Sequence, residues 1–96
     1  MNALVEYHGR GMDWIGGWRL CVILRTGRLY VHLFEVERLK RYKVLLRDLK
    51  RTTRETTATP SRTARVIRRI AARYKRCDVG YPKKAVREAL RVLKGD

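Results

Sequence analysis

The sequence has few acidic residues, and this scarcity is its most informative feature. Its 96 residues include nine Asp and Glu against 24 Lys and Arg, which gives a formal net charge of +15. A positive charge of that size exceeds what solubility requires and attracts polyanions such as nucleic acid, an anionic membrane or an acidic protein surface. So few acids also leave little material for the paired carboxylates that many hydrolytic enzymes use.

Cysteine and long apolar runs are scarce as well. Cys21 and Cys77 lie far apart, without the spacing of a disulfide framework or a zinc site, and are interpreted as reduced thiols. No apolar stretch has the length that spans a bilayer, and the first residues lack the apolar core of a signal peptide. These absences predict a cytoplasmic protein that does not enter a membrane.

Residues for catalysis or metal binding are equally scarce. The two histidines, His8 and His32, have no Cys, Asp or Glu at the spacing of a catalytic triad or a closed metal site. Glu35 and Glu37 are two residues apart on one face of a strand and are interpreted as surface charges beside Arg38. We therefore expect no catalytic residue, no metal ion and no cofactor, and we do not expect an enzyme.

Charge and aromatic residues are distributed unevenly along the chain. Residues 1–48 contain nine Lys and Arg against five Asp and Glu, whereas residues 49–96 contain fifteen against four. Most aromatic residues lie in the first half. We expect a single domain over 1–96, made of a β-rich part (1–49), a Thr-rich linker loop (50–59) and a basic two-helix part (60–95).

The β-rich part contains two apolar segments joined by a short turn. WRLCVIL (18–24) and RLYVHLFEV (28–36) flank Thr26 and Gly27, which predicts a β-hairpin. In the first segment the face with Trp18, Leu20, Val22 and Leu24 is predicted to be buried. Both faces of the second are apolar, which predicts cover on both sides or closure into a barrel. LVEYH and RYKVLL are further strand candidates, giving three to four antiparallel strands and then a short helical turn.

This layout resembles the small SH3-like barrels that include Tudor-type modules. The resemblance covers residues 4–49 and implies a module that binds proteins, methylated ligands or nucleic acid. Within the loop GRGMDWIGG, Trp14 is flanked by glycines. It is a candidate for stacking on a base or anchoring a partner, and a core position is the alternative.

The basic part begins with a helix that carries a stripe of arginines. Thr59 and Pro60 fit the N-cap and first position of a helix that runs to about Cys77, and Gly80 can end it. Ile67, Ala71 and neighbouring apolar residues form one arc of this helix. The opposite side carries Arg62, Arg65, Arg69, Arg73 and Arg76.

A second helix is predicted from Pro82 to about Lys94, and it adds Lys83, Lys84 and Arg87 to the basic surface. IAARY (70–74) followed by VREALRVL (86–93) is similar to the helix-turn-helix of GntR-type winged-helix repressors, although the segment between them is longer than that family's turn. The resemblance implies that Lys83, Lys84 and Arg87 lie where residues of the second helix contact the DNA major groove.

Together these features predict an α+β protein that binds nucleic acid, with duplex DNA slightly favoured over RNA. The arginine stripe is expected to contact phosphates, because each guanidinium can donate two hydrogen bonds to one phosphate. The main alternative is a small inhibitor or adaptor, of the kind found in phages and mobile elements, that docks its basic face on an acidic protein. A merely solvated basic face is the third interpretation, and the pattern indicates no oligomeric state.

Overall fold

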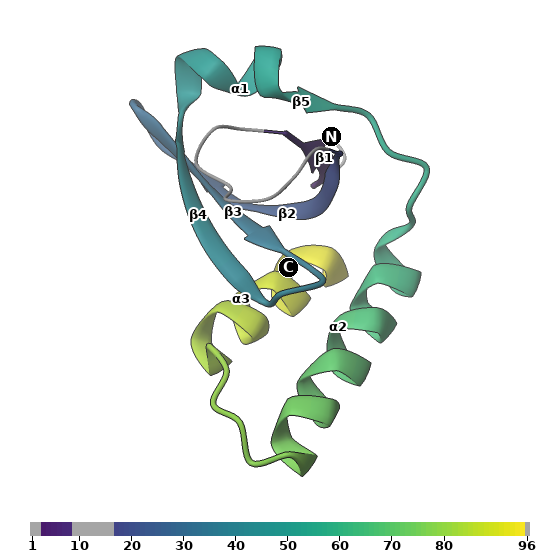
Figure 1. Ribbon diagram of the computed structural model, residues 1–96. Coiled ribbons are helices and arrows are strands. Elements are labelled where there is room, and N and C mark those ends of the chain that lie inside the picture. The colour runs from purple at the N-terminus through teal and green to yellow at the C-terminus, as the bar shows by residue number, and fades with distance from the viewer. Residues whose placement is uncertain (1–2, 9–16, 96) are drawn as a thin grey trace.

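The structure is a computed structural model that describes residues 3–8 and 17–95. Its elements are β1 (Leu4–Tyr7), β2 (Arg19–Thr26), β3 (Tyr30–Glu35), β4 (Lys40–Leu45), α1 (Leu46–Thr52), β5 (Thr53–Arg54), α2 (Pro60–Arg76) and α3 (Lys83–Lys94). The strands form one antiparallel sheet in the order β4-β3-β2-β1-β5. In Figure 1, α1 lies at one end of the sheet, and α2 and α3 lie together on the other side of the molecule.

The α+β class is confirmed, but the sheet of the described residues has five strands where three to four were predicted. The two predicted helices are α2 and α3, and α1 lies where a short helical turn was predicted. The additional strand, β5, consists of Thr53 and Arg54, which pair with Tyr7 and Glu6 of β1. It lies within the segment predicted to be a linker loop. A two-residue strand has no periodicity of its own, so only its pairing with a distant strand defines it.

Apolar side chains are buried on both faces of this sheet. One face buries Tyr7, Cys21, Val31, Leu33 and Val44, with Leu49 of α1 packed against them. The other face packs against α2 and α3 and buries Leu4, Val22, Leu24, Phe34, Ile67, Ala71, Ala85, Val86 and Ala89. The second hairpin strand, β3, is therefore covered on the side of Val31 and Leu33, whereas on its other side Phe34 is buried and Tyr30 is exposed. In β2, the face opposite Val22 and Leu24 is also buried, at Cys21.

The predicted hairpin is formed by β2 and β3. At its turn, the Gly27 N–H donates a hydrogen bond to the Tyr30 carbonyl oxygen at 2.8 Å. A Cβ at Gly27 would lie 3.2 Å from that same oxygen, so the close approach favours glycine. The strand register shifts between Ile23, which pairs with Leu33, and Arg25, which pairs with His32. Leu24 is thus the extra residue of a β-bulge.

The predicted N-terminus of α2 is confirmed. The Thr59 hydroxyl oxygen accepts a hydrogen bond from the Arg62 N–H at 3.4 Å, and Pro60 occupies the first helical position. The helix ends earlier than Gly80: Cys77 is its C-cap, and Asp78 adopts the left-handed conformation (φ 55°). Asp tolerates this region better than most residues, which explains why glycine is not required there.

The two thiols lie in different surroundings and are expected to react differently. Both are free, Cys21 buried and Cys77 exposed. Burial, and secondarily the charge of Glu35, raises the pKa of Cys21 to about 12, and the thiolate is the reactive form. In the native protein near pH 8, Ellman's reagent is expected to titrate one thiol rapidly, and Cys77→Ser to abolish that phase. Two equally fast thiols in the folded protein would contradict the buried position of Cys21.

Candidate nucleic-acid interface

The arginine stripe lies on the solvent side of α2. The helix turns Thr63, Ile67 and Ala71 inward, where they are buried against the sheet and α3. The five predicted arginines are all exposed: Arg62, Arg65, Arg69, Arg73 and Arg76. We call these five residues the α2 ridge. At 1.5 Å per residue the ridge is about 21 Å long, comparable to about six phosphates along one DNA strand.

The α2 ridge has no ion-pair partner among the residues that the structure describes. All four ion pairs among the described residues lie within the part of the chain up to β5: Arg19–Glu37, Arg38–Glu35, Arg51–Asp48 and Arg54–Glu6. No described Lys or Arg of α2 or α3 has such a partner. The few acids of the sequence are therefore used mainly beside the sheet, and the helices keep a strong positive charge that a polyanion can compensate.

The second predicted group of cations lies on α3. Lys83, Lys84 and Arg87 are exposed in the first half of this helix, which packs against α2. Lys84 and Arg87 also line a depression of about 240 Å³ together with Glu88 and Arg91. The rings of Tyr74 and Tyr81 meet edge to face, with centroids 6.4 Å apart, across the segment that joins the two helices. This contact helps to fix the position of α2 relative to α3.

Further exposed cations, on α2 and β4, were not predicted as part of the basic surface. Arg68 is exposed on α2 beside the ridge, and Arg91 is exposed on α3. On β4, Arg41 and Lys43 are exposed and alternate with Tyr42 and Val44. That alternation is visible in KRYKVL and indicates that Arg41 and Lys43 share one side of this strand.

Of the two tryptophans, Trp14 was the candidate for partner binding and Trp18 was predicted to lie in the core. Trp14 lies outside the described residues. Trp18, predicted to be buried, is 37% exposed, since it precedes β2 and lies beyond the region that the helices cover. The Arg54 guanidinium carbon lies 4.4 Å from the centre of its ring, and the His8 ring centroid lies 5.6 Å away. Arg54 Nε also donates to Glu6 Oε1 at 2.6 Å.

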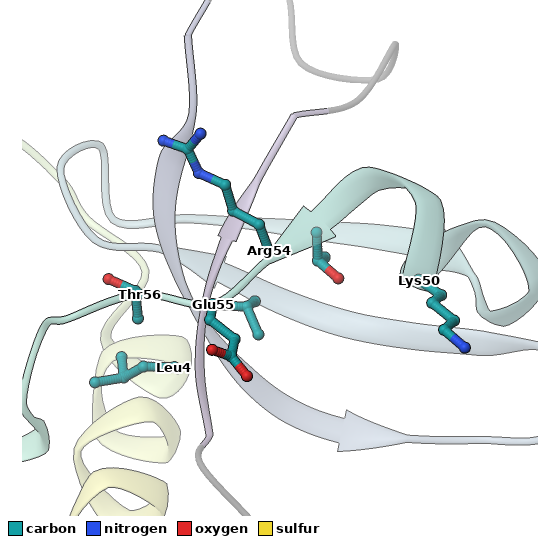
Figure 2. A pocket seen from close by; sticks show the side chains of 7 residues that line it. Leu4, Lys50, Arg54, Glu55 and Thr56 are labelled. Atoms are coloured by element: carbon teal, nitrogen blue, oxygen red, sulfur yellow. The ribbon is translucent and has the colours of Figure 1, made fainter.

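A groove of about 690 Å³ lies beside β1 and β5 (Figure 2). It is lined by Leu4, Val5, Lys50, Thr53, Arg54, Glu55 and Thr56. Glu55 lies in the same lining as the two cations, Lys50 and Arg54. The mixed charge makes this groove a poor continuation of the basic surface on the helices.

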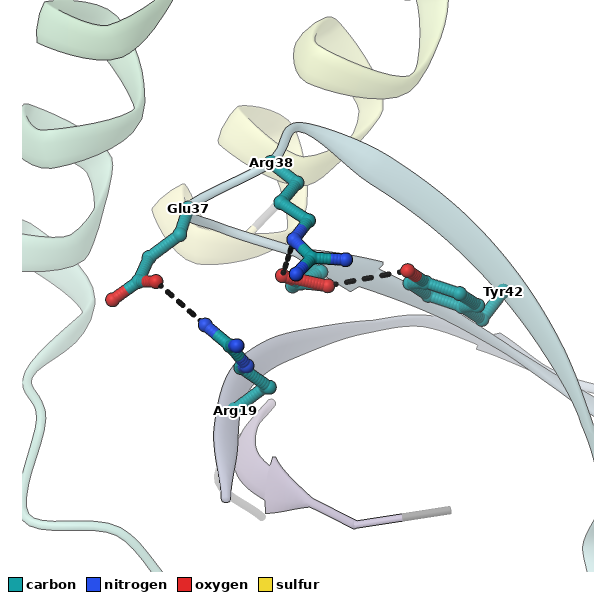
Figure 3. A network of polar contacts seen from close by, with 5 residues as sticks. Arg19, Glu37, Arg38 and Tyr42 are labelled. Carbon is teal, nitrogen blue, oxygen red and sulfur yellow. Dashed lines mark hydrogen bonds and ion pairs between the residues drawn. The ribbon is translucent and has the colours of Figure 1, made fainter. Parts of the chain in front are cut away.

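The carboxylate pair considered in the sequence is separated by the fold (Figure 3). Glu37 is exposed and forms an ion pair with Arg19 at 3.0 Å. Glu35, predicted to be a surface charge, is instead fully buried, because β3 continues to Glu35 and turns it toward the side of Leu33. Its Oε1 accepts a hydrogen bond from the Tyr42 hydroxyl at 3.2 Å, and its Oε2 lies 3.7 Å from Arg38 Nε.

The surroundings of Glu35 are those of a structural carboxylate. Burial, and then the charge of Glu35, raises the pKa of Tyr42, so this hydroxyl stays protonated and available as a donor. Within residues 3–8 and 17–95, no three His, Cys, Asp or Glu side chains gather closely enough to hold a metal ion. His32 lies in β3, as expected, beside Arg25, Arg41 and Lys43.

Comparisons with protein-family models, curated proteins and solved structures found no match for this chain. The resemblances to SH3-like barrels and to GntR-type helix-turn-helix segments therefore rest on layout and on short stretches of sequence. The helices of the described residues include none with the length and apolar character of a membrane span.

Proposed function

We propose that this protein binds nucleic acid and contacts phosphates chiefly through the α2 ridge. The observation that supports this most strongly is a line of five exposed arginines on one helix, none with an acidic partner among the described residues. Like charges three and four residues apart destabilise an isolated helix by a few tenths of a kcal/mol per pair. A ligand that supplies phosphates removes this repulsion.

Duplex DNA is the form we favour over RNA. Two neighbouring helices, with Lys83, Lys84 and Arg87 at the start of the second, suit a ligand whose backbone lies along α2 and whose groove faces α3. Contacts from the α2 ridge position the ligand without reading its sequence. Any base readout then falls to Lys83, Lys84 and Arg87.

We also propose that the sheet belongs to the SH3-like barrels. The order β4-β3-β2-β1-β5, with a short helix between β4 and β5, supports this, since the first and last strands of the sheet part are neighbours. Fold alone does not select a ligand, so this proposal carries no weight in the argument for nucleic acid.

The alternative is an inhibitor or adaptor that docks on an acidic protein. The exposed ring of Trp18, with the Arg54 guanidinium against it, favours this reading, because Trp and Arg dominate the energetics of many protein interfaces. An inhibitor of this kind is expected to hold one protein partner at salt concentrations that remove it from DNA.

The experiment that tests the proposed function compares ligand forms. Fluorescence anisotropy with labelled duplex DNA, single-stranded DNA and structured RNA is expected to give sub-micromolar binding of duplex DNA at about 0.1 M salt. Weak binding that does not distinguish these forms and disappears near 0.15 M salt would contradict the proposal. A pull-down for an acidic protein partner then becomes the next step.

A further inference from the structure

Part of the sheet facing the helices is left uncovered by them. Phe34 of β3 is buried under α2 and α3, but residues farther along the same side of the sheet are not. Tyr30 is 38% exposed, its neighbour on this side, His32, is half-buried, and the flanking cations of β2 and β4 are exposed. We call this surface the strand face; it consists of Arg25, Tyr30, His32, Arg41 and Lys43.

The β-bulge at Leu24 places a cation on the strand face. Val22 pairs with Phe34 and Ile23 with Leu33, but the next pair is Arg25 with His32. The extra residue, Leu24, stays with the apolar cluster under the helices. Without the bulge, regular alternation would turn Arg25 to the opposite side of the sheet. The bulge thus keeps Leu24 packed in the apolar cluster and also brings the Arg25 guanidinium beside His32.

The strand face is strongly positive. His32 lies opposite Arg25 of β2 and Lys43 of β4, and Arg41 lies two residues from Lys43 on the same side of β4, opposite Phe34. The pKa of His32 is lowered, first by loss of hydration and then by Arg25, Arg41 and Lys43, while Glu88 of α3 acts in the opposite direction. Among the described residues, no acid forms an ion pair with these three cations.

An aromatic ring lies among these cations. The Lys43 ammonium is 4.1 Å from the centre of the Tyr30 ring. Two exposed leucines, Leu29 and Leu46, are neighbours, since the Leu46 N–H donates to the Leu29 carbonyl at 2.8 Å. An aromatic ring surrounded by cations is the combination with which proteins hold unpaired nucleotides, because bases stack on the ring while cations meet the phosphates.

We propose that the strand face binds a single-stranded segment of nucleic acid. The Lys43 ammonium, which lies over the Tyr30 ring in the free protein, moves to a phosphate, and a base takes its place on the ring. The adjoining phosphates lie against Arg25 and Arg41. This proposal rests on the proposed function and extends it to a ligand with duplex and unpaired parts. Because α2 packs on α3 and α3 packs on β2, α3 links the helix that carries the α2 ridge to the sheet.

Replacement of Tyr30 tests this proposal. A labelled single strand of about 12 nucleotides is expected to bind Tyr30→Leu about 5- to 150-fold more weakly than the unaltered protein, the range found for loss of one stacked base. Leucine keeps apolar cover over the sheet but removes the ring, and Tyr30→Phe, which keeps the ring, is the matched control. Anisotropy measures both variants, and circular dichroism checks that they fold.

The outcomes separate the two proposals. Tyr30→Leu is expected to bind a blunt duplex as well as the unaltered protein does, because that contact belongs to the α2 ridge. If the single strand binds Tyr30→Leu as tightly as Tyr30→Phe, the strand face does not stack bases, and the proposed function stands without it. If the unaltered protein binds neither duplex nor single strand, both proposals are wrong.

The pH dependence of single-strand binding provides an independent test. A phosphate beside His32 raises its pKa above the lowered value in the free protein, so binding takes up a proton. As the pH falls from about 8 to about 6, the affinity of the unaltered protein for the single strand is therefore expected to rise about two- to tenfold more than the affinity of His32→Gln does. If His32→Gln and the unaltered protein show the same pH profile, the phosphates do not lie beside His32, and this placement of the ligand is wrong.

Competition with poly-L-glutamate shows whether the strand face recognises charge alone. This polymer has regularly spaced negative charges but no bases. It is expected to displace the single strand only at a large excess of charge. Displacement at equal charge concentration would contradict base stacking and favour an acidic protein as the ligand.

Discussion

Simultaneous replacement of Arg65, Arg69 and Arg73 by glutamine is expected to weaken binding of duplex DNA on the order of 100-fold at 0.15 M salt. Each phosphate contact contributes about 0.7 log units through counterion release at that salt concentration, and the variant removes three. The three side chains are exposed and have no ion-pair partner among the described residues, so nothing in the fold depends on them. Anisotropy titrations with one labelled duplex measure the effect.

The same variant is expected to be no less stable than the unaltered protein. Arg65, Arg69 and Arg73 take part in five like-charged pairs at spacings of three or four residues, with one another and with Arg62, Arg68 and Arg76. Their replacement relieves this repulsion, which is worth a few tenths of a kcal/mol per pair. The melting temperature should stay constant or rise slightly. A large fall in the melting temperature would mean that the loss of DNA binding reflects unfolding of the variant.

A charge-matched control lies on α1, at the other end of the sheet (Figure 1). Replacing Arg47, Lys50 and Arg51 with glutamine lowers the net charge by the same amount. It breaks only the Arg51–Asp48 pair, and exposed pairs of this kind contribute about 0 to 1 kcal/mol. The control variant is expected to bind duplex within a few-fold of the unaltered protein. Equal losses in the two variants would mean that DNA responds to total charge and that the α2 ridge has no special role.

Replacement of Phe34 by alanine is expected to have the largest effect on stability, a loss of about 3 to 5 kcal/mol in the free energy of unfolding. Phe34 is fully buried in the middle of the sheet, within the cluster that contains Ile67 of α2 and Ala89 of α3. Its loss removes apolar contact from the sheet and the helices together. Domains of this size are commonly stable by only about 5 to 15 kcal/mol, so the variant is expected to be partly unfolded at 37 °C.

Urea unfolding followed by circular dichroism measures this loss, with Phe34→Leu as the control. Leucine retains much of the apolar contact and is expected to lose less than half as much stability. A loss below about 1 kcal/mol for Phe34→Ala would contradict the described packing of the helices on the sheet.

Local patterns predicted those parts of the fold whose signals are local. The β2–β3 hairpin, the start of α2 at Thr59 and Pro60, and exposure of the α2 ridge follow from alternation, capping and helical periodicity. Strand β5 could not be predicted from a local pattern, because its two residues are defined only by their pairing with β1, nearly fifty positions earlier. The burial of Glu35 depends in the same way on Tyr42 and Arg38 arriving from the next turn and strand.

The candidate site also has one part that local patterns predict and another part that they do not. The cations of α2 and α3 were predictable because a helix displays its polar side with a fixed period. The strand face was not predictable from the sequence, because it depends on how far α3 extends over the sheet and on the bulge that turns Arg25 beside His32. Trp18 was wrongly predicted to be buried for a related reason: its strand pattern is apolar, but the helices do not cover that end.

The salt dependence of duplex binding by the unaltered protein tests the central claim most directly. With five phosphate contacts from the α2 ridge, a plot of log K against log salt concentration is expected to have a slope of about −4 to −5. The variant with glutamine at positions 65, 69 and 73 should reduce that slope by about 2.7. A slope between 0 and about −1 for the unaltered protein would mean that phosphates do not meet the ridge, and would contradict the account.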